Sequence, residues 1–281
     1  MKAKYSVTGT GKAVVLLHGS MASRTQWRSL MDELRQNFRV IAMDLSGYGE
    51  TPFPENPESY SLKYESDLLN GVVADTLDEG ESYHLVGHSY GGAVALHHAY
   101  HHRERVRSLI AIEPMSFHLL EKDHEHLLAS EDMIAEISRD IAQGRSMDGA
   151  EKFIDLWMSS GTFRRLSEQE KGVLSNGVRK MVLDFQAAAT EPLTMDDCGQ
   201  LPGTFSLIAG KQSPPYSLCI TQRIVQEISH SELFWVDGGH FSTVSHPYQI
   251  NLLIHSLLRA ADRQPQDRRD TEDKLAFIME R

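Results

Sequence analysis

The sequence predicts an α/β protein whose core is a doubly wound, mostly parallel β-sheet carrying an inserted all-helical cap. The first observation is that short apolar runs alternate with amphipathic runs of helical length in the first 114 residues and again after residue 195. The second is that the stretch of roughly eighty residues between these parts reads as helix only. Strands separated by helices pair in parallel through right-handed crossovers, so the pattern indicates one layered domain with an insertion.

The expected strands are runs rich in Val, Ile, Leu and Phe that end in polar or glycine-rich turns. They span 13–19, 39–45, 83–89, 106–113, 203–211 and 231–239. Between them, apolar residues three and four apart predict helices over 24–37, 61–79, 90–102, 221–228 and 249–261.

The chain divides accordingly. We assign residues 1–114 and 196–262 to the α/β core and 115–195 to the cap, where segments such as MIAEISRDIAQ present one apolar face that suits packing over the end of a sheet. The last residues, 263–281, are rich in charge and include a Gln-Pro-Gln break at 264–266, so we expect a solvated tail, with a short contact helix around Leu275 to Met279 as the alternative.

Composition limits the partners. Lys and Arg number 28 against 39 Asp and Glu, a net charge of −11, which argues against nucleic acid or an anionic membrane surface. Two cysteines, Cys198 and Cys219, allow neither a disulfide framework nor a cysteine zinc site. The N-terminus has no signal-peptide core and no run approaches the length of a membrane span. We expect a cytoplasmic protein with a small-molecule substrate and no cofactor or metal, and a homodimer stays open.

Four histidines at 97, 98, 101 and 102 fall on the predicted helix over 90–102. Residues four apart share a helix face, so these histidines raise the hypothesis of a metal site. The acidic residues that complete a metal-binding helix motif are missing, and we expect a solvated helix end instead.

The stretch Gly87-His88-Ser89-Tyr90-Gly91 joins a predicted strand to a predicted helix. This is the G-x-S-x-G pattern in the context of strand, sharp turn and helix that exposes a serine nucleophile. Glycines are needed because the serine sits in a strained conformation and side chains at 87 and 91 would clash in the turn. The helix N-terminus behind the serine favours developing negative charge.

Other strand ends carry related signals. His18-Gly19 closes the first predicted strand, Asp44-Leu45-Ser46-Gly47 the second, and Gly238-Gly239-His240 the last. In this order the motifs resemble the α/β-hydrolase superfamily, serine-nucleophile branch, over roughly residues 4–260, with the insertion at the usual place for its cap.

The resemblance implies roles for named residues. Ser89 is the expected nucleophile and His240 the general base and later acid. The backbone N–H groups of Ser20 and Tyr90 are expected to form the oxyanion hole, with Met21 as a nearby substitute for Ser20. Asp44 matches a turn of the superfamily that is usually structural.

The triad acid departs from the usual pattern. Most members carry an Asp shortly after the penultimate strand, where this sequence has Ser213, and no carboxylate follows before Glu227. Some members, certain haloalkane dehalogenases and lipases among them, carry the acid after the strand that follows the nucleophile's helix. Glu113 stands there and is our candidate. The alternatives are that Glu113 only faces solvent, that Asp237 is the acid, or that Ser89 and His240 act as a dyad.

We therefore predict hydrolysis of a small or medium apolar carboxylic ester, thioester or lactone through an acyl-enzyme. Within the superfamily, a serine at the nucleophile position argues against the dehalogenase and epoxide-hydrolase branches, which use Asp there. The alternatives are a C–C bond hydrolase acting on diketone-like substrates and a low-turnover ligand-binding or receptor protein. The expected pocket residues are apolar or aromatic side chains near the motifs and in the cap: Met21, Met115, Phe117, His118, Trp157, Phe163 and Phe241.

Overall fold

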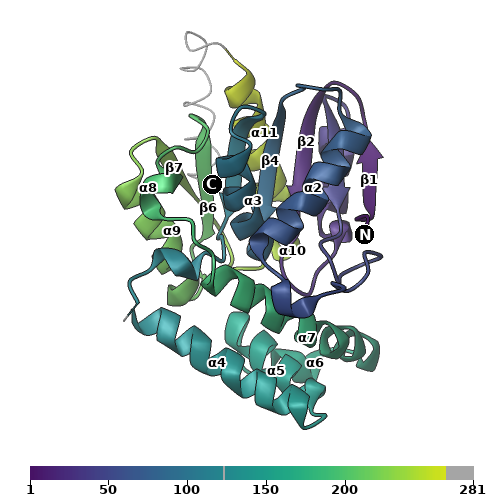
Figure 1. Ribbon diagram of the computed structural model, residues 1–281, viewed down its shortest axis with the longest axis vertical. Helices are drawn as coiled ribbons and strands as arrows, with labels where there is room; N and C mark the ends of the chain where they lie inside the picture. The colour runs from purple at the N-terminus through teal and green to yellow at the C-terminus, as the bar shows by residue number, and fades with distance from the viewer. Residues whose placement is uncertain (123, 264–281) are drawn as a thin grey trace.

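The centre of the molecule is a seven-stranded sheet (Figure 1), in a computed structural model that describes residues 1–122 and 124–263. Its strands are β1 (Tyr5–Thr8), β2 (Lys12–Leu17), β3 (Phe38–Met43), β4 (Tyr83–His88), β5 (Val106–Ile112), β6 (Phe205–Gly210) and β7 (Ser231–Val236). They lie in the order β1-β3-β2-β4-β5-β6-β7. β1 runs antiparallel to β3 and the other neighbours pair in parallel. The predicted doubly wound, mostly parallel sheet is confirmed.

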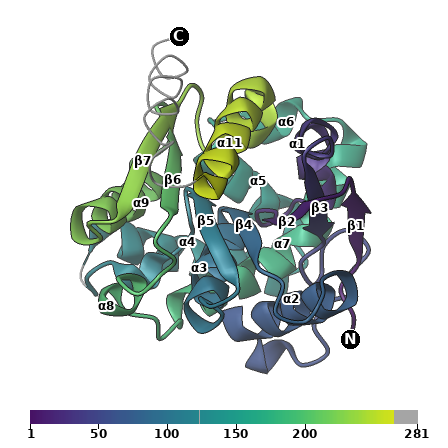
Figure 2. The ribbon, with the colours of Figure 1, turned by 90° about the horizontal axis from the view of Figure 1, so that it is seen from above.

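Helices cover both faces of this sheet, as Figure 2 shows from above. The helices of the core are η1 (Arg24–Trp27), α1 (Arg28–Leu34), η2 (Pro57–Ser59), α2 (Leu62–Thr76), α3 (Tyr90–His101), α9 (Pro215–Glu227), α10 (Ser242–Ser245) and α11 (Pro247–Asp262). On β2, Val14 and Leu16 join the core cluster under α1 and α11, while Val15 and Leu17 join the cluster under α2 and α3. Since successive side chains of a strand point to opposite faces, both faces of β2 are buried, which explains its uninterrupted apolar run.

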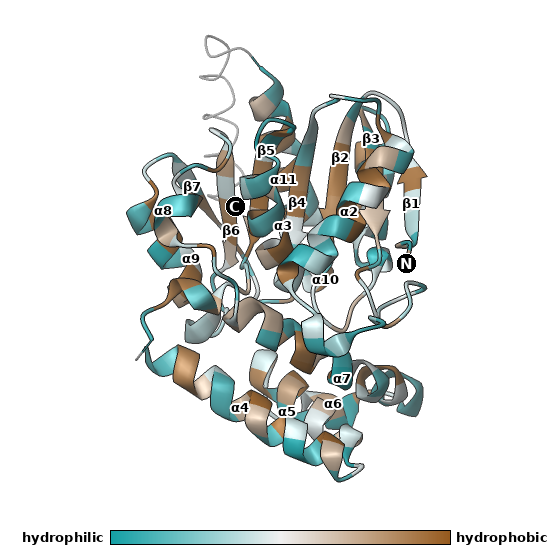
Figure 3. Cartoon of the chain, viewed as in Figure 1, coloured by the Kyte–Doolittle hydropathy of each residue, from teal (hydrophilic) through white to brown (hydrophobic). Residues whose placement is uncertain are grey.

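A second group of helices lies between β5 and β6 in the chain: η3 (Phe117–Leu119), α4 (Glu125–Ala142), α5 (Ser146–Trp157), α6 (Thr162–Arg165), α7 (Glu168–Ala189) and α8 (Met195–Cys198). Helices α4 to α7 form a layer at the carboxyl ends of the parallel strands (Figure 1). We call α4 to α7 the helical insertion. Figure 3 shows its helices with mixed hydrophilic and hydrophobic faces, whereas the strands are mainly hydrophobic. The apolar faces of α5 and α7 meet in one buried cluster that includes Phe153 and Phe185.

Two local differences from the predicted elements have simple causes. The edge strand β1 was not predicted, because four residues that are mostly half-buried carry little periodic signal. Helix α9 begins at Pro215, six residues before its expected start at 221, because proline is favoured in the first turn of a helix. The charged tail predicted for 263–281 lies outside the described residues from position 264 onward.

The histidine cluster on α3 also differs from expectation. His97 and His98 are buried, so a solvated helix end is the wrong description for them. His98 contacts the Ser66 hydroxyl at 2.8 Å and the Tyr83 hydroxyl at 2.6 Å, and His97 contacts Glu191 at 3.0 Å. Over the part of the chain that the structure covers, no group of three or more potential metal ligands comes together. Likewise, none of the described helices is both long and apolar enough to cross a membrane.

Candidate active site

Ser89 lies at the sharp turn between β4 and α3, where the sequence predicts it. It is the N-cap of α3 and has φ 55° and ψ −118°, a conformation outside the regions that L-residues favour. The flanking glycines explain how the turn closes: a Cβ at Gly87 would overlap the Gly91 carbonyl, and one at Gly91 would overlap the carbonyl of His18. The serine hydroxyl is thereby presented at the carboxyl edge of the sheet.

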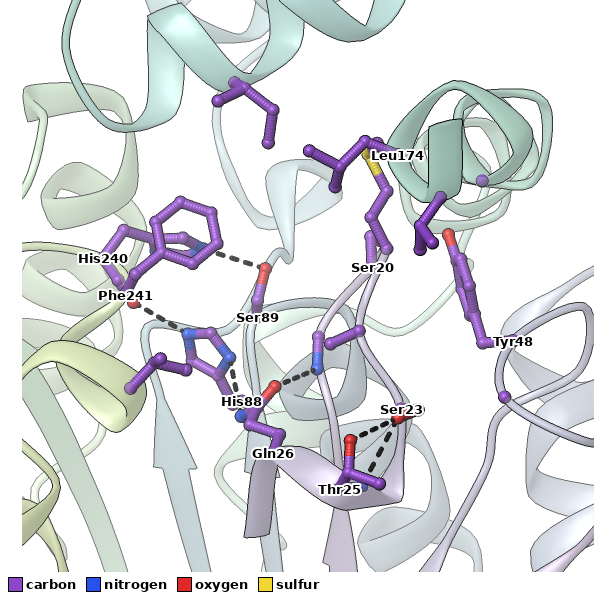
Figure 4. Close-up of a pocket in the computed structure, with 18 of the residues that line it drawn as sticks. Ser20, Ser23, Thr25, Gln26, Tyr48, His88, Ser89, Leu174, His240 and Phe241 are labelled. Carbon is purple, nitrogen blue, oxygen red and sulfur yellow. Dashed lines mark hydrogen bonds between the residues drawn. The ribbon is translucent and has the colours of Figure 1, made fainter. Parts of the chain in front are cut away.

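His240 follows β7 and faces Ser89 across the sheet edge (Figure 4). Its Nε2 lies 3.0 Å from the Ser89 Oγ, within hydrogen-bonding distance. The side chain is 4% exposed and is therefore almost fully buried. The geometry allows the imidazole to accept the serine proton.

Glu113 lies immediately after β5. It completes a chain of contacts that runs from Ser89 through His240 to Glu113. Its Oε2 lies 2.8 Å from His240 Nδ1. The Gly210 N–H donates to Oε1 at 2.8 Å, and the hydroxyls of Ser213 and Ser217 also donate to this carboxylate. Burial by itself raises the pKa of Glu113, but the contact with His240 and these hydrogen bonds outweigh it and lower the pKa to about 2. The carboxylate is therefore charged at neutral pH.

The other candidate acid lies elsewhere. Asp237 is half-exposed, and its carboxylate pairs with Lys211 at 2.9 Å. Of the two candidate carboxylates, Glu113 is the one that contacts His240 in the structure. Asp44 is buried beside Arg24 and accepts the backbone N–H groups of Arg24 and Glu50, at 2.7 and 2.9 Å. This agrees with the expected structural role.

The two expected oxyanion donors flank the serine. Tyr90 is the first residue of α3, and Ser20 follows the His18-Gly19 pair at the end of β2. β2 and β4 are neighbours, and a Cβ built on Gly19 would lie 3.2 Å from the Ser89 Cβ. Within the described part of the chain, the backbone N–H groups of Ser20 and Tyr90 have no hydrogen-bond partner. Both are thus unpaired, as donors to an oxyanion beside Ser89 would have to be.

Backbone strain concentrates at this site. Within residues 1–122 and 124–263, a left-handed φ outside glycine occurs at Met21, Ser89 and Glu113, with values of 60°, 55° and 42°. Such conformations are costly for residues with a Cβ and persist where the surroundings enforce them. All three lie at strand ends that meet around the Ser89 hydroxyl.

His88 contacts the backbone of His240. One of its ring nitrogens, Nε2, lies 2.8 Å from the backbone carbonyl of His240, and the other lies 3.2 Å from the Gln26 amide nitrogen. Burial, reinforced by the nearby His240, lowers the pKa of His88 to about 3. His88 is therefore neutral, donating to the carbonyl and accepting from Gln26. This agrees with the sequence expectation that it packs and binds backbone.

A cavity of about 1080 Å³ opens beside Ser89 and His240. Of the expected pocket residues, Met21 and Phe241 line it. Its wall on the side of the helical insertion comes from α5 and α7 and includes Phe153, Ile154 and Leu174. Gln26 and Tyr48 add polar groups on the side of the core (Figure 4).

Five expected pocket residues do not line this cavity. Met115 is buried under the nucleophile turn, where its N–H donates to the Ser89 carbonyl at 3.0 Å. Phe117, in η3, stacks on Phe185 of α7. His118 binds the Ala188 carbonyl at 3.0 Å. These side chains fill the contact between core and insertion, because apolar residues next to a site serve packing as readily as substrate binding.

The remaining two expected pocket residues, Phe163 and Trp157, differ in what they contact. Phe163 is buried in α6 and does not line the cavity. Trp157 does not line the cavity either, but its ring lies 4.3 Å from the His240 ring, centroid to centroid. It therefore touches the candidate base rather than a substrate in this cavity.

Sequence reasoning missed Phe153, Ile154, Leu174 and Gln26 as lining residues. Phe153 and Ile154 belong to the apolar face of α5, whose spacing predicts a helix but not which neighbour the face meets. Gln26 has no motif of its own, and its role appears only through contacts with His88 and Gly19.

Comparisons with known proteins concern the fold that carries this site. Residues 12–140 match a family model described as the alpha/beta hydrolase fold. Over 114 residues the chain is 33% identical to a haloalkane dehalogenase of Sphingobium indicum, a match that covers 40% of this chain and 38% of that protein. The chain thus spans about two fifths of the length of this curated relative.

Two solved structures extend the likeness to almost the whole chain. An enol-lactonase from Burkholderia xenovorans LB400 superimposes with a TM-score of 0.76, at 15% identity, over 92% of this chain and 96% of that one. A meta-cleavage product hydrolase from Pseudomonas fluorescens IP01 gives a TM-score of 0.69 at 21% identity, over 92% and 94%. At these identities the likeness concerns the fold.

Proposed function

The chain has the α/β-hydrolase fold, and on that premise we propose that it is a serine hydrolase cleaving a small or medium apolar carboxylic ester, thioester or lactone through an acyl-enzyme. The observation that carries the proposal is the continuous line from the Ser89 Oγ through His240 to Glu113, with contacts of 3.0 and 2.8 Å. Nucleophile, base and orienting acid in this order are what acyl transfer requires.

In the first step the Ser89 oxygen attacks the carbonyl carbon while His240 Nε2 takes the hydroxyl proton. Glu113 stabilises the resulting imidazolium and holds Nδ1 protonated, so that Nε2 is free to accept. The tetrahedral oxyanion accepts hydrogen bonds from the backbone N–H groups of Ser20 and Tyr90. Collapse expels the alcohol, thiol or lactone oxygen, which takes its proton from His240.

In the second step water attacks the acyl carbon and gives its proton to His240. A second tetrahedral oxyanion forms in the same place and collapses to release the carboxylic acid. Ser89 regains its proton from His240, which returns the enzyme to its starting state.

The cavity supports an apolar acyl or alkyl group. Phe153, Ile154 and Leu174 form an apolar wall, and a volume of about 1080 Å³ accommodates a small or medium substrate. Ser89 and His240 lie at the edge of the same cavity, so the ester end of the molecule would face them.

One observation favours an enzyme over a ligand-binding protein on the same scaffold. The binding alternative rested on the serine at the usual acid position, 213. Glu113 reaches His240 from the neighbouring strand end, so the serine and histidine have an acid partner. A C–C bond hydrolase uses the same line of residues, and substrate tests separate it from an esterase.

The test is hydrolysis of p-nitrophenyl esters from acetate to octanoate by the wild type, Ser89→Ala and Ser245→Ala. Ser245 is an exposed serine of α10 and provides the matched control. We expect turnover in the wild type and in Ser245→Ala and its loss in Ser89→Ala. Equal rates in all three would overturn the nucleophile assignment, and no turnover of any ester would move the proposal to the C–C bond hydrolase.

A further inference from the structure

A buried charged cluster links helix α7 to the core next to Ser20 and Tyr90. Lys180 and Asp184 lie one turn apart on α7, are 1% and 0% exposed, and form an ion pair with each other. Glu65 of α2, also 0% exposed, lies 3.6 Å from the Lys180 Nζ. Burying three charged side chains in one place is costly unless each is paired and hydrogen-bonded. Such an arrangement calls for a role beyond packing.

Asp184 binds the side chain of one expected oxyanion residue. Its Oδ2 accepts a hydrogen bond from the Ser20 hydroxyl at 2.6 Å and another from the Tyr48 hydroxyl at 2.6 Å. Ser20 comes from the end of β2, whereas Asp184 comes from the helical insertion, 164 positions further along the chain. The loop that presents the Ser20 N–H is therefore tied to α7.

Lys180 reaches the second expected oxyanion residue through Tyr60. The Lys180 ammonium donates to the Tyr60 hydroxyl at 2.7 Å, and that hydroxyl lies 2.7 Å from the hydroxyl of Tyr90. The Tyr60 hydroxyl also contacts the Glu65 carboxylate at 2.5 Å. The rings of Tyr60, Tyr48 and Tyr90 surround the Lys180 Nζ, with centroids at 4.3, 4.8 and 5.2 Å.

The charged and polar groups of the cluster all have hydrogen-bond or charge partners, which explains why they can be buried together. Burial raises the pKa of Asp184, opposed by Lys180 and by the hydroxyls of Ser20 and Tyr48. Burial likewise raises the pKa values of Tyr48, Tyr60 and Tyr90 well above their usual value, so these phenols remain hydrogen-bond donors. Each member has a fixed partner, and a network of this kind holds its members in one geometry.

We propose that Lys180 and Asp184 are positioning residues of the oxyanion hole, acting through Ser20 and Tyr90. The inference rests on the proposed function, because it concerns the donors that this reaction uses. Its consequence is that the helical insertion takes part in the chemistry: docking of α7 sets the two N–H groups that bind the oxyanion. Neither Lys180 nor Asp184 lines the cavity, so neither acts by touching substrate.

The experiment compares Asp184→Ala with Glu168→Ala, a change of the same kind on the same helix at an 85% exposed carboxylate. One readout is kcat and KM on the best p-nitrophenyl ester. The other is inhibition by a trifluoromethyl ketone and by the secondary alcohol of the same shape. The ketone carbon bonds to the Ser89 oxygen, the serine proton passes to His240, and the former carbonyl oxygen becomes an oxyanion in the hole. The alcohol forms no oxyanion.

For Asp184→Ala we expect kcat to fall by about ten- to a hundredfold with KM within about threefold, since only transition-state binding is lost. Affinity for the ketone should fall by a similar factor, and affinity for the alcohol should stay within about twofold. Glu168→Ala should match the wild type. A ketone-to-alcohol affinity ratio unchanged in a folded Asp184→Ala would overturn the inference and leave a structural role only.

Ser20→Ala covers the case in which Asp184→Ala does not fold. It removes one hydroxyl and keeps the backbone N–H, so we expect a loss of about three- to tenfold in kcat and a lower ketone-to-alcohol ratio. Unchanged values in this variant would contradict the inference. If the wild type neither turns over esters nor binds the ketone at Ser89, the proposed function itself fails; turnover in the wild type with no effect in Ser20→Ala removes the inference alone.

Discussion

The hydroxyl of Ser213 donates a hydrogen bond to Oε1 of Glu113, so the residue at the usual acid position serves an acid supplied by the neighbouring strand end. β5 and β6 are adjacent and parallel, and their carboxyl ends meet at one edge of the sheet. Either strand end is therefore placed to present a carboxylate to His240. In this chain Glu113, just after β5, is that carboxylate. Gly210 at the end of β6 donates its N–H to it, and Ser213, three residues further on, donates its hydroxyl.

Glu113→Gln should reduce kcat by about 10³- to 10⁴-fold, because the amide no longer stabilises the imidazolium or sets the tautomer of His240. Asp237→Asn is the control, since it removes the other carboxylate near His240 in the sequence, and it should stay within about threefold of the wild type. Steady-state kinetics on the best p-nitrophenyl ester checks both. A large loss in Asp237→Asn with a small one in Glu113→Gln would reverse the assignment.

A carboxylate placed after β6, at position 213, should restore part of the activity that Glu113→Gln loses. In the double variant Glu113→Gln/Ser213→Asp, the new carboxylate stands beside the glutamine side chain and close to His240. We expect at least about tenfold recovery of kcat over Glu113→Gln alone. Ser213→Asp in the wild-type background should be less stable, because two carboxylates then share one buried place. A double variant no faster than Glu113→Gln would contradict this prediction.

Leu174 lines the apolar wall of the cavity, and a larger side chain there should shorten the accepted acyl chain. Leu174→Trp is expected to lower kcat/KM for the octanoate ester about tenfold relative to the acetate ester. Leu174→Met keeps the volume and should leave the ratio near that of the wild type. Measuring both esters on both variants tests the placement of the acyl group; an unchanged ratio in Leu174→Trp would place it elsewhere.

His88 should make the protein less stable in mild acid. Its pKa is about 3 in the folded state against the ordinary 6.5, so the unfolded chain takes up the proton first as the pH falls. The free energy of unfolding should therefore decrease below pH 6.5, by about 1.4 kcal/mol between pH 7.5 and 5.5 for this residue. His88→Gln should lose correspondingly less over that interval in denaturant titrations at the two pH values. The same loss in variant and wild type would exclude His88 as the cause.

Local patterns were enough for the fold and for two members of the candidate triad. The apolar run of β2 predicted a buried strand because a strand buried on both faces is mostly apolar. Ser89 and His240 were predicted because a nucleophile turn needs glycines at set positions and the expected base follows the last strand. The residues that make up each of these motifs lie within a few positions of one another in the chain.

Long-range contacts decided the rest. Whether Glu113, Asp237 or no acid meets His240 depends on how strand ends 127 positions apart converge, and the lining by Leu174 depends on which face α7 turns to the core. Lys180 and Asp184 gave no signal either, since a Lys and an Asp four apart on a helix ordinarily form a solvated pair. The sequence alone determined the order of the elements and singled out Ser89 and His240 as candidates, because the periodicity of the elements and the glycines of the turn can be read from neighbouring residues. Only the tertiary structure placed Glu113 beside His240, formed the cavity wall and assembled the buried cluster, because each depends on side chains that packing brings together from distant segments.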